Sequence, residues 1–184
     1  NLGSGNEWRL LGGGDSVAFQ GAGGTVNLNG GKLSMADKFG LGSIGGANNN
    51  TFQVYGGAVI NLNGTSGDAY LGENGSGNTM IISNGASLVA NRYVLLGVGA
   101  GASNTTVIVT GTDSVMRATV GNPFASLTIG YQGGSNTLWI MNGGTVSNGL
   151  AYVGGQDATL ASTNNRVIVS GGYWTNTTRT TGNN

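Results

Sequence analysis

Ionisable side chains are the first candidates for chemistry in this chain, and they are few. Only 8% of the 184 residues are charged, with seven acidic side chains balanced by seven basic ones. The acidic residues are spread along the whole length: Glu7, Asp15, Asp37, Asp68, Glu73, Asp113 and Asp157. Glycoside cleavage needs two carboxylates that converge on one bond. Asp68 and Glu73 are the closest pair, and we expect them to flank a strand rather than share one face.

Other catalytic residue types are missing or lack partners. The chain has no His and no Cys, so it has no side chain that titrates near neutral pH by default, no disulfide and no thiolate. Ser is common, but no Gly-x-Ser-x-Gly turn with a base partner is present. We therefore expect no catalytic residue and no cofactor, and a carbohydrate-active β-helix enzyme is the third of three hypotheses.

Calcium binding is the remaining chemical possibility. The nonapeptide Gly-Gly-x-Gly-x-Asp motif ligates Ca²⁺ in stacked β repeats. Segments 12–15 and 66–68 contain fragments of it, but with the wrong spacing. Asp favours turns in general, so we interpret Asp15 and Asp68 as turn residues and expect no metal site.

The elements that would position any site follow from an internal repeat of about 28 residues. Gly is abundant, at 38 of 184 residues. Equivalent glycines mark the period: Gly30, Gly57, Gly85, Gly111, Gly143 and Gly171. An Asn followed by a β-type run precedes most of them, as at Asn78 and Asn136, and an apolar-Gly pair ends each repeat, as at Leu71-Gly72. Such a period is typical of stacked repeats.

Each repeat predicts three short strands, because runs rich in Val, Ile, Thr and Leu alternate with Gly, Asn and Ser clusters. No stretch keeps a helical period. Three strands in about 28 residues match one coil of a parallel β-helix, so we expect an all-β β-solenoid of about six coils. Residues 1–184 form one such segment, and the ends (2–6 and 182–184) resemble partial repeats of a longer array. Insertions are expected at 120–124 and 155–162.

Alternation of residue types predicts which side chains point inward. In the first strand of each repeat these are pairs such as Phe52/Val54 and Val167/Val169, and in the third strand pairs such as Ala151/Val153. Stacked coils place like residues above like, so Asn78, Asn104 and Asn136 are candidates for a hydrogen-bonded ladder. The six Asn-Gly pairs favour tight turns.

These repeats carry a family resemblance. Segments 24–33 (GTVNLNGGKL) and 142–146 (NGGTV) are similar to the repeat units of bacterial autotransporter passengers and related surface β-helix proteins. The resemblance covers nearly the whole chain. It implies an exported, right-handed parallel β-helix, located outside the cell or on the bacterial cell surface, with an adhesive or structural role.

The outward-facing positions suggest an interface. Between the inward residues of the strands lie side chains that are more apolar than a solvent-facing surface requires: Ile81, Ile108, Trp139 and Ile168 in the first strand, and Tyr70, Leu95 and Tyr152 in the third. Exposed apolar stripes commonly mark interaction sites. Two alternatives stay open: loops cover the stripes, or the register is one residue off and inside and outside exchange.

Charge and these stripes define the function hypotheses. A zero net charge gives no electrostatic footprint for nucleic acid, and no apolar run is long enough to span a membrane as a helix. The first hypothesis is an extracellular structural repeat protein that self-associates into a filament, sheath or surface layer. The second is an adhesin or glycan-binding stalk that uses aromatics such as Tyr173 and Trp174.

Overall fold

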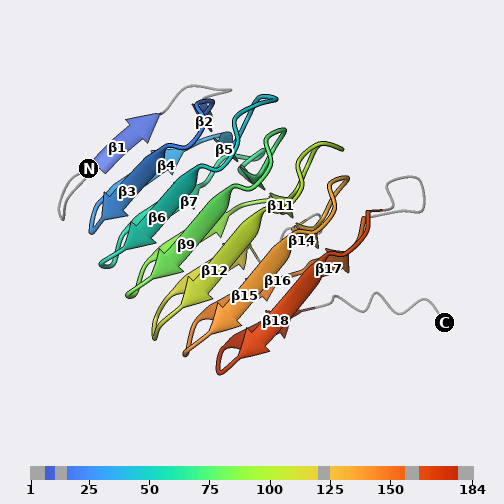
Figure 1. Ribbon diagram of the computed structural model, residues 1–184. Coiled ribbons are helices and arrows are strands. Elements are labelled where there is room, and N and C mark those ends of the chain that lie inside the picture. The colour runs from blue at the N-terminus through green and yellow to red at the C-terminus, as the bar shows by residue number, and fades with distance from the viewer. Residues whose placement is uncertain (1–6, 11–15, 120–124, 156–161, 178–184) are drawn as a thin grey trace.

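The computed structural model describes residues 7–10, 16–119, 125–155 and 162–177, with side chains from residue 16 onward. These residues form 19 strands and no helix (Figure 1). All strand ladders are parallel and belong to three sheets, which we call A, B and C. The expected insertions at 120–124 and 155–162, and the partial repeats at 2–6 and 182–184, fall wholly or mostly outside the described residues.

The three sheets take one strand each from every repeat. Sheet A contains β3 (Thr25–Asn29), β6 (Thr51–Tyr55), β9 (Thr79–Ser83), β12 (Thr106–Thr110), β15 (Thr137–Met141) and β18 (Arg166–Ser170). Sheet B contains β1 (Glu7–Leu10), β4 (Lys32–Met35), β7 (Val59–Leu62), β10 (Ser87–Ala90), β13 (Val115–Ala118), β16 (Thr145–Asn148) and β19 (Tyr173–Asn176). Sheet C contains β2 (Ser16–Phe19), β5 (Lys38–Leu41), β8 (Asp68–Leu71), β11 (Tyr93–Leu96), β14 (Ser126–Ile129) and β17 (Leu150–Val153).

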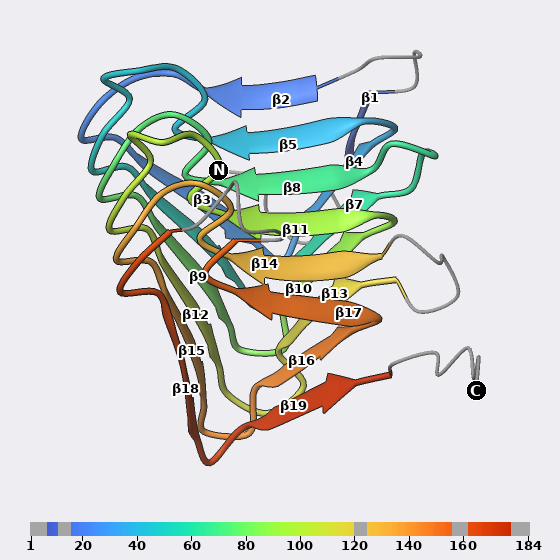
Figure 2. The ribbon, with the colours of Figure 1, turned by 90° about the vertical axis from the view of Figure 1, so that its right-hand side faces the viewer.

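Consecutive strands always enter different sheets, and each strand pairs with the one three places along the chain. This connectivity is that of a β-solenoid. Five complete turns run from β3 to β17, with further strands before and after them, and Figure 2 shows the strands of sheet C stacked one above another. The prediction of a parallel β-solenoid with three strands per coil is confirmed.

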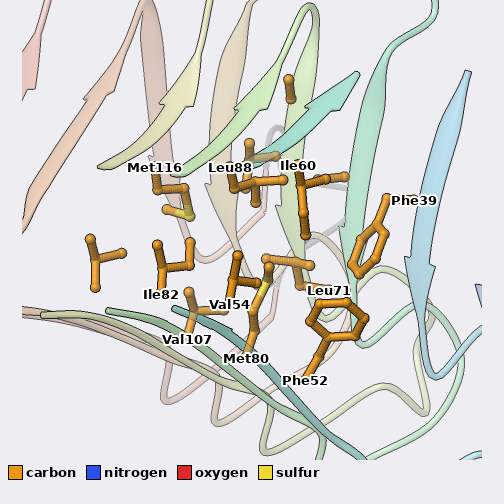
Figure 3. Close-up of a cluster of buried hydrophobic side chains, with 14 of the residues drawn as sticks. Phe39, Phe52, Val54, Ile60, Leu71, Met80, Ile82, Leu88, Val107 and Met116 are labelled. Carbon is orange, nitrogen blue, oxygen red and sulfur yellow. The ribbon is translucent and has the colours of Figure 1, made fainter. Parts of the chain in front are cut away.

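The core confirms the predicted alternation. Phe52 and Val54, Met80 and Ile82, and their counterparts on β12 and β15 are fully or almost fully buried inside the solenoid (Figure 3). Sheets B and C add Ile60, Leu88, Met116, Phe39 and Leu71 to the same cluster. Burial of one such side chain stabilises the fold by about 1.5–3 kcal/mol, so the aliphatic columns supply the main driving force for coil stacking.

Inward positions on the last described strands of sheets A and C are more open. Val169 on β18 is 49% exposed and Val153 on β17 is 50% exposed. Each of these strands pairs with a described strand on one side only, so part of each side chain is left without a neighbouring coil. Val167 still packs against the core.

The apolar-Gly pair that ends each repeat has a steric cause. Gly97 follows β11 with a φ of 63°, a conformation that disfavours residues with a Cβ. A Cβ there would lie 2.2 Å from Nδ2 of Asn136, one coil further on. A Cβ on Gly42 would likewise lie against Nδ2 of Asn78, one coil further on. The Gly of one coil and the Asn of the next are therefore a coupled pair.

Those Asn side chains form a ladder along the corner. The backbone N–H and Nδ2 of Asn50 both donate to Oδ1 of Asn78, at 3.0 and 3.1 Å, and Asn136 donates in the same way to Asn165. Thr105 occupies the ladder position between them, and its N–H donates to Asn136. The prediction that Asn104 belongs to the ladder is wrong, because Thr105 occupies that position. Asn104 lies one residue earlier with a φ of 58° and turns the chain into the corner.

Candidate interaction surface

The outward positions at the centre of sheet A form one straight row. The strand register aligns Gln53 with Ile81, Ile81 with Ile108, Ile108 with Trp139 and Trp139 with Ile168. Neighbouring strands lie about 4.8 Å apart, so the row repeats at that interval. The structure therefore brings together the four sheet A residues that the sequence indicated, in adjacent coils. We call Ile81, Ile108, Trp139 and Ile168 the apolar row.

The apolar row is accessible. All four side chains are partly exposed, whereas the residues before and after Ile81, Ile108 and Trp139 are buried in the core. Figure 1 looks onto sheet A, and no other strand lies in front of it. The alternative that inside and outside are exchanged is thus wrong for sheet A, and among the described strands none covers the row.

A second row beside it was not recognised from sequence. Five of the six sheet A strands begin with a threonine, and the sixth begins with Arg166. The register aligns these first residues in one row: Thr25, Thr51, Thr79, Thr106, Thr137 and Arg166. The Nε of Arg166 donates to Oγ1 of Thr137 at 3.1 Å. The signal was present in the repeated Asn-Thr steps that open the strands. The apolar row is therefore bordered on one side by hydroxyl groups.

Sheet C differs from the expectation. Its outward row aligns Tyr70, Leu95, Thr128 and Tyr152, but Leu95 is only 4% exposed and Thr128 is completely buried. Tyr70 and Tyr152 are partly exposed. The predicted exposure of Leu95 is wrong, because Leu95 and Thr128 are buried although they occupy outward positions on sheet C. Sheet C thus offers no continuous exposed apolar stripe.

The outer face of sheet C instead carries a cluster of charges. Nζ of Lys38 lies 2.7 Å from Oε1 of Glu73, and Arg92 binds both carboxylate oxygens of Asp68. Lys38 also lies 5.4 Å from the ring centroid of Tyr70. The expectation that Asp68 and Glu73 only flank a strand is wrong, because Glu73 follows β8 and reaches back to Lys38 on the face where Asp68 lies.

Tyr70 lies between these charges. Its hydroxyl donates to Oδ2 of Asp68 at 3.3 Å. Burial raises the pKa of Tyr70 to about 12, and the negative charge of Asp68 and this hydrogen bond add to the effect. Asp68 also raises the pKa of the Arg92 guanidinium through their hydrogen bonds. Each described carboxylate in the cluster has a cation as its partner, so we assign the cluster a structural role on sheet C.

The described residues contain neither a metal-binding cluster nor a membrane-spanning helix. Within ranges 7–10, 16–119, 125–155 and 162–177, no three His, Cys, Asp or Glu side chains lie close enough together to hold a metal ion. No helix in these ranges is long and apolar enough to cross a membrane.

The fold and its surface define a parallel β-solenoid in which the outer face of sheet A presents an apolar row beside a threonine row. Comparison with known proteins adds no relative: no protein-family model matches the chain, and neither a curated protein nor a solved structure matches it. The outer face of sheet A is therefore the feature from which a function is inferred.

Proposed function

We propose that this chain is an extracellular structural repeat protein that binds copies of itself through the outer face of sheet A. The observation that carries the proposal is the apolar row, four partly exposed side chains in adjacent coils. Contiguous exposed apolar surface often marks an interaction site.

The spacing of the row favours a second copy as the partner. A solenoid presents its side chains every 4.8 Å, approximately, along its axis. A second copy has the same interval, so contacts made at one coil recur at the next. Identical side chains interdigitate in this way in steric zippers. A partner whose side chains repeat at a different interval would lose this alignment after one or two coils.

Charge favours association as well. The net charge is zero and only 8% of residues are charged, so copies approach each other with little repulsion. Among the described sheet A residues, Arg166 is the one charged side chain on the outer face. Desolvation of the face therefore costs little.

The resemblance of the repeats to bacterial surface β-helix proteins supports a location outside the cell or on the bacterial surface. An array that associates laterally there would serve as a filament, sheath or surface layer. This role requires a rigid scaffold and an accessible face, and it requires no catalytic group.

Substitution of the largest residue in the apolar row tests the proposal. We expect Trp139→Asp to lower the sedimenting mass of the protein at increasing concentration, because a buried carboxylate opposes face-to-face packing. Circular dichroism should show unchanged β content, since Trp139 points away from the core. Analytical ultracentrifugation of both proteins measures the effect.

Val89 provides the matched control. It is also a partly exposed outward residue in the centre of a strand, but on sheet B. Val89→Asp should associate like the unmodified protein. Association that survives Trp139→Asp, or that is lost equally in Val89→Asp, would contradict a role for sheet A.

A glycan-binding stalk is the second candidate function. Tyr173 on β19 is 67% exposed, and an exposed aromatic ring can stack on a sugar. Trp174 is less suited, because its Nε1 donates to Asn148 at 2.8 Å and its ring packs against the core. Glycan-array binding by a monomer, lost in Tyr173→Ala, would favour this candidate over self-association.

A further inference from the structure

The sheet A row changes character along the solenoid, and this limits how two copies can meet. Asn27 and Gln53 occupy its first two positions, and the apolar row occupies the next four. If the proposed self-association holds, the two halves of the row contribute differently. The polar half favours water and the apolar half favours contact.

Two copies can pack these faces about a two-fold axis in two ways. Homodimer contacts are generally two-fold and self-complementary. With the axis along the solenoid, the copies run in the same direction and each residue of the central row meets its own equivalent. With the axis along the strands, the copies run in opposite directions, so that Ile81 faces Ile168 of the second copy and Ile108 faces Trp139.

The same-direction arrangement packs poorly. It places two Trp139 rings against each other at one coil, which holds the flanking isoleucines apart. It also buries Gln53 and Asn27 against their own copies. Facing amides can pair with each other, but they only exchange hydrogen bonds to water for hydrogen bonds within the pair, so this part of the contact adds little.

The opposite-direction arrangement avoids both problems. Each Trp139 faces the smaller Ile108, twice by symmetry, so the gap between the faces stays even. Gln53 and Asn27 extend beyond the overlap into water. The single charged residue, Arg166, faces the Thr79 hydroxyl of the second copy, which resembles its contact with Thr137 within the chain.

We propose that the unit of self-association is this antiparallel pair, in which the apolar rows of two copies overlap in opposite directions. Four strands of five residues cover about 19 Å by about 16 Å, or roughly 300 Å² of each face. That is smaller than the ~800 Å² per partner of a standard interface, so the pair is transient. The contact is also closed, so a filament or layer uses a further surface to grow.

Chemical cross-linking distinguishes the two directions. Because the chain has no Cys, an introduced Cys is the only thiol that the reagent can modify. The reagent is a short bis-maleimide that spans about 10 Å, the distance between packed sheets. We mix Ile81→Cys with Ile168→Cys in equal amounts and treat Gln53→Cys separately. In the antiparallel pair, positions 81 and 168 face each other, whereas two copies of position 53 lie about 24 Å apart along the axis.

The expected result is cross-linked dimer in the mixture and only background with Gln53→Cys. Val89→Cys on sheet B sets the background from random collision. The same-direction arrangement gives the reverse pattern, because position 53 then meets itself while positions 81 and 168 are about 17 Å apart. That pattern would overturn the inference.

Sedimentation of the same variants separates this inference from the proposed function. Background cross-linking in a protein that sediments above the monomer mass refutes the antiparallel pair but keeps self-association. Background cross-linking in a protein that stays monomeric at every concentration refutes both.

Discussion

At the scale of single residues, Thr105 is the weak point of the corner ladder. Nδ2 of Asn78 and Oγ1 of Thr105 are both buried without a hydrogen-bond partner. At the equivalent positions, Asn50 and Asn136 donate to the Asn of the following coil. Threonine is too short to accept from Asn78 in that way, so the ladder is broken between these two coils.

Thr105→Asn should therefore stabilise the protein. The side-chain oxygen of the new Asn would accept a hydrogen bond from Asn78. The side chain also has room, because Gly72 has no Cβ and leaves the same space beside residue 105 that Gly42 leaves beside Asn78. We expect the free energy of unfolding to rise by about 1–2 kcal/mol, measured by urea denaturation. Thr106→Asn, at the neighbouring outward position, should leave it within about 0.5 kcal/mol. A destabilised Thr105→Asn variant would contradict this account.

The ladder also shows how far residue type alone predicts the structure of the corner. The recurrence of Asn before most sheet A strands predicted stacked hydrogen bonds, and these exist. The sequence did not distinguish Asn104 from the true ladder position, because both lie before the strand and only backbone conformation separates them. The positive φ of Asn104 is a corner property that residue type alone does not determine.

At the scale of strands, the spacing between coils depends on glycines that admit no side chain. Gly144 lies directly before β16, and a Cβ there would be 2.5 Å from the carbonyl oxygen of Val109 on β12. Backbone atoms cannot move aside as a flexible side chain can. Gly45, in a corner loop, has no atom within 4 Å of its Cβ position.

Gly144→Ala should consequently destabilise the fold, because the methyl group would push the coils that contain β12 and β15 apart. We expect a loss of about 1–3 kcal/mol, the usual cost of overpacking. Gly45→Ala is the control and should be neutral or stabilising by up to about 1 kcal/mol. Thermal unfolding followed by circular dichroism measures both. Equal melting temperatures for the two variants would show that coil spacing tolerates a side chain at Gly144.

Strand alternation made the inside of the solenoid predictable. Phe52, Val54, Met80 and Ile82 are buried as the period of two required. The outside was predictable only for sheet A. Leu95 has the same outward position and apolar character as Ile108, yet Leu95 is buried. The two residues share a position in the alternating pattern and differ in burial, and the local sequence pattern does not contain that difference.

At the scale of the whole molecule, stacking brings distant residues together at regular intervals. Lys38 and Glu73 are 35 residues apart but form an ion pair, and Asp68 binds Arg92 across 24 residues. Both separations are close to the repeat of about 28 residues, as expected for positions in neighbouring coils. The repeat length did not predict their convergence around Tyr70, because Glu73 reaches that face from a loop.

The whole chain carries zero net charge, and its described residues present the apolar row on sheet A. This combination makes a prediction about solution conditions. Charged interfaces weaken as salt screens them, whereas apolar association is insensitive to moderate salt and strengthened by sulfate. We expect the sedimenting mass at a fixed protein concentration to stay constant between about 0.05 M and about 0.5 M sodium chloride, where the Debye length falls severalfold. Sodium sulfate should increase it. Trp139→Asp should respond weakly to sulfate, because its sheet A face can no longer pack.

Dissociation of the unmodified protein by sodium chloride would instead assign the contact to charged residues such as Lys32, Arg117 and Arg166, and would remove the apolar row from the interface.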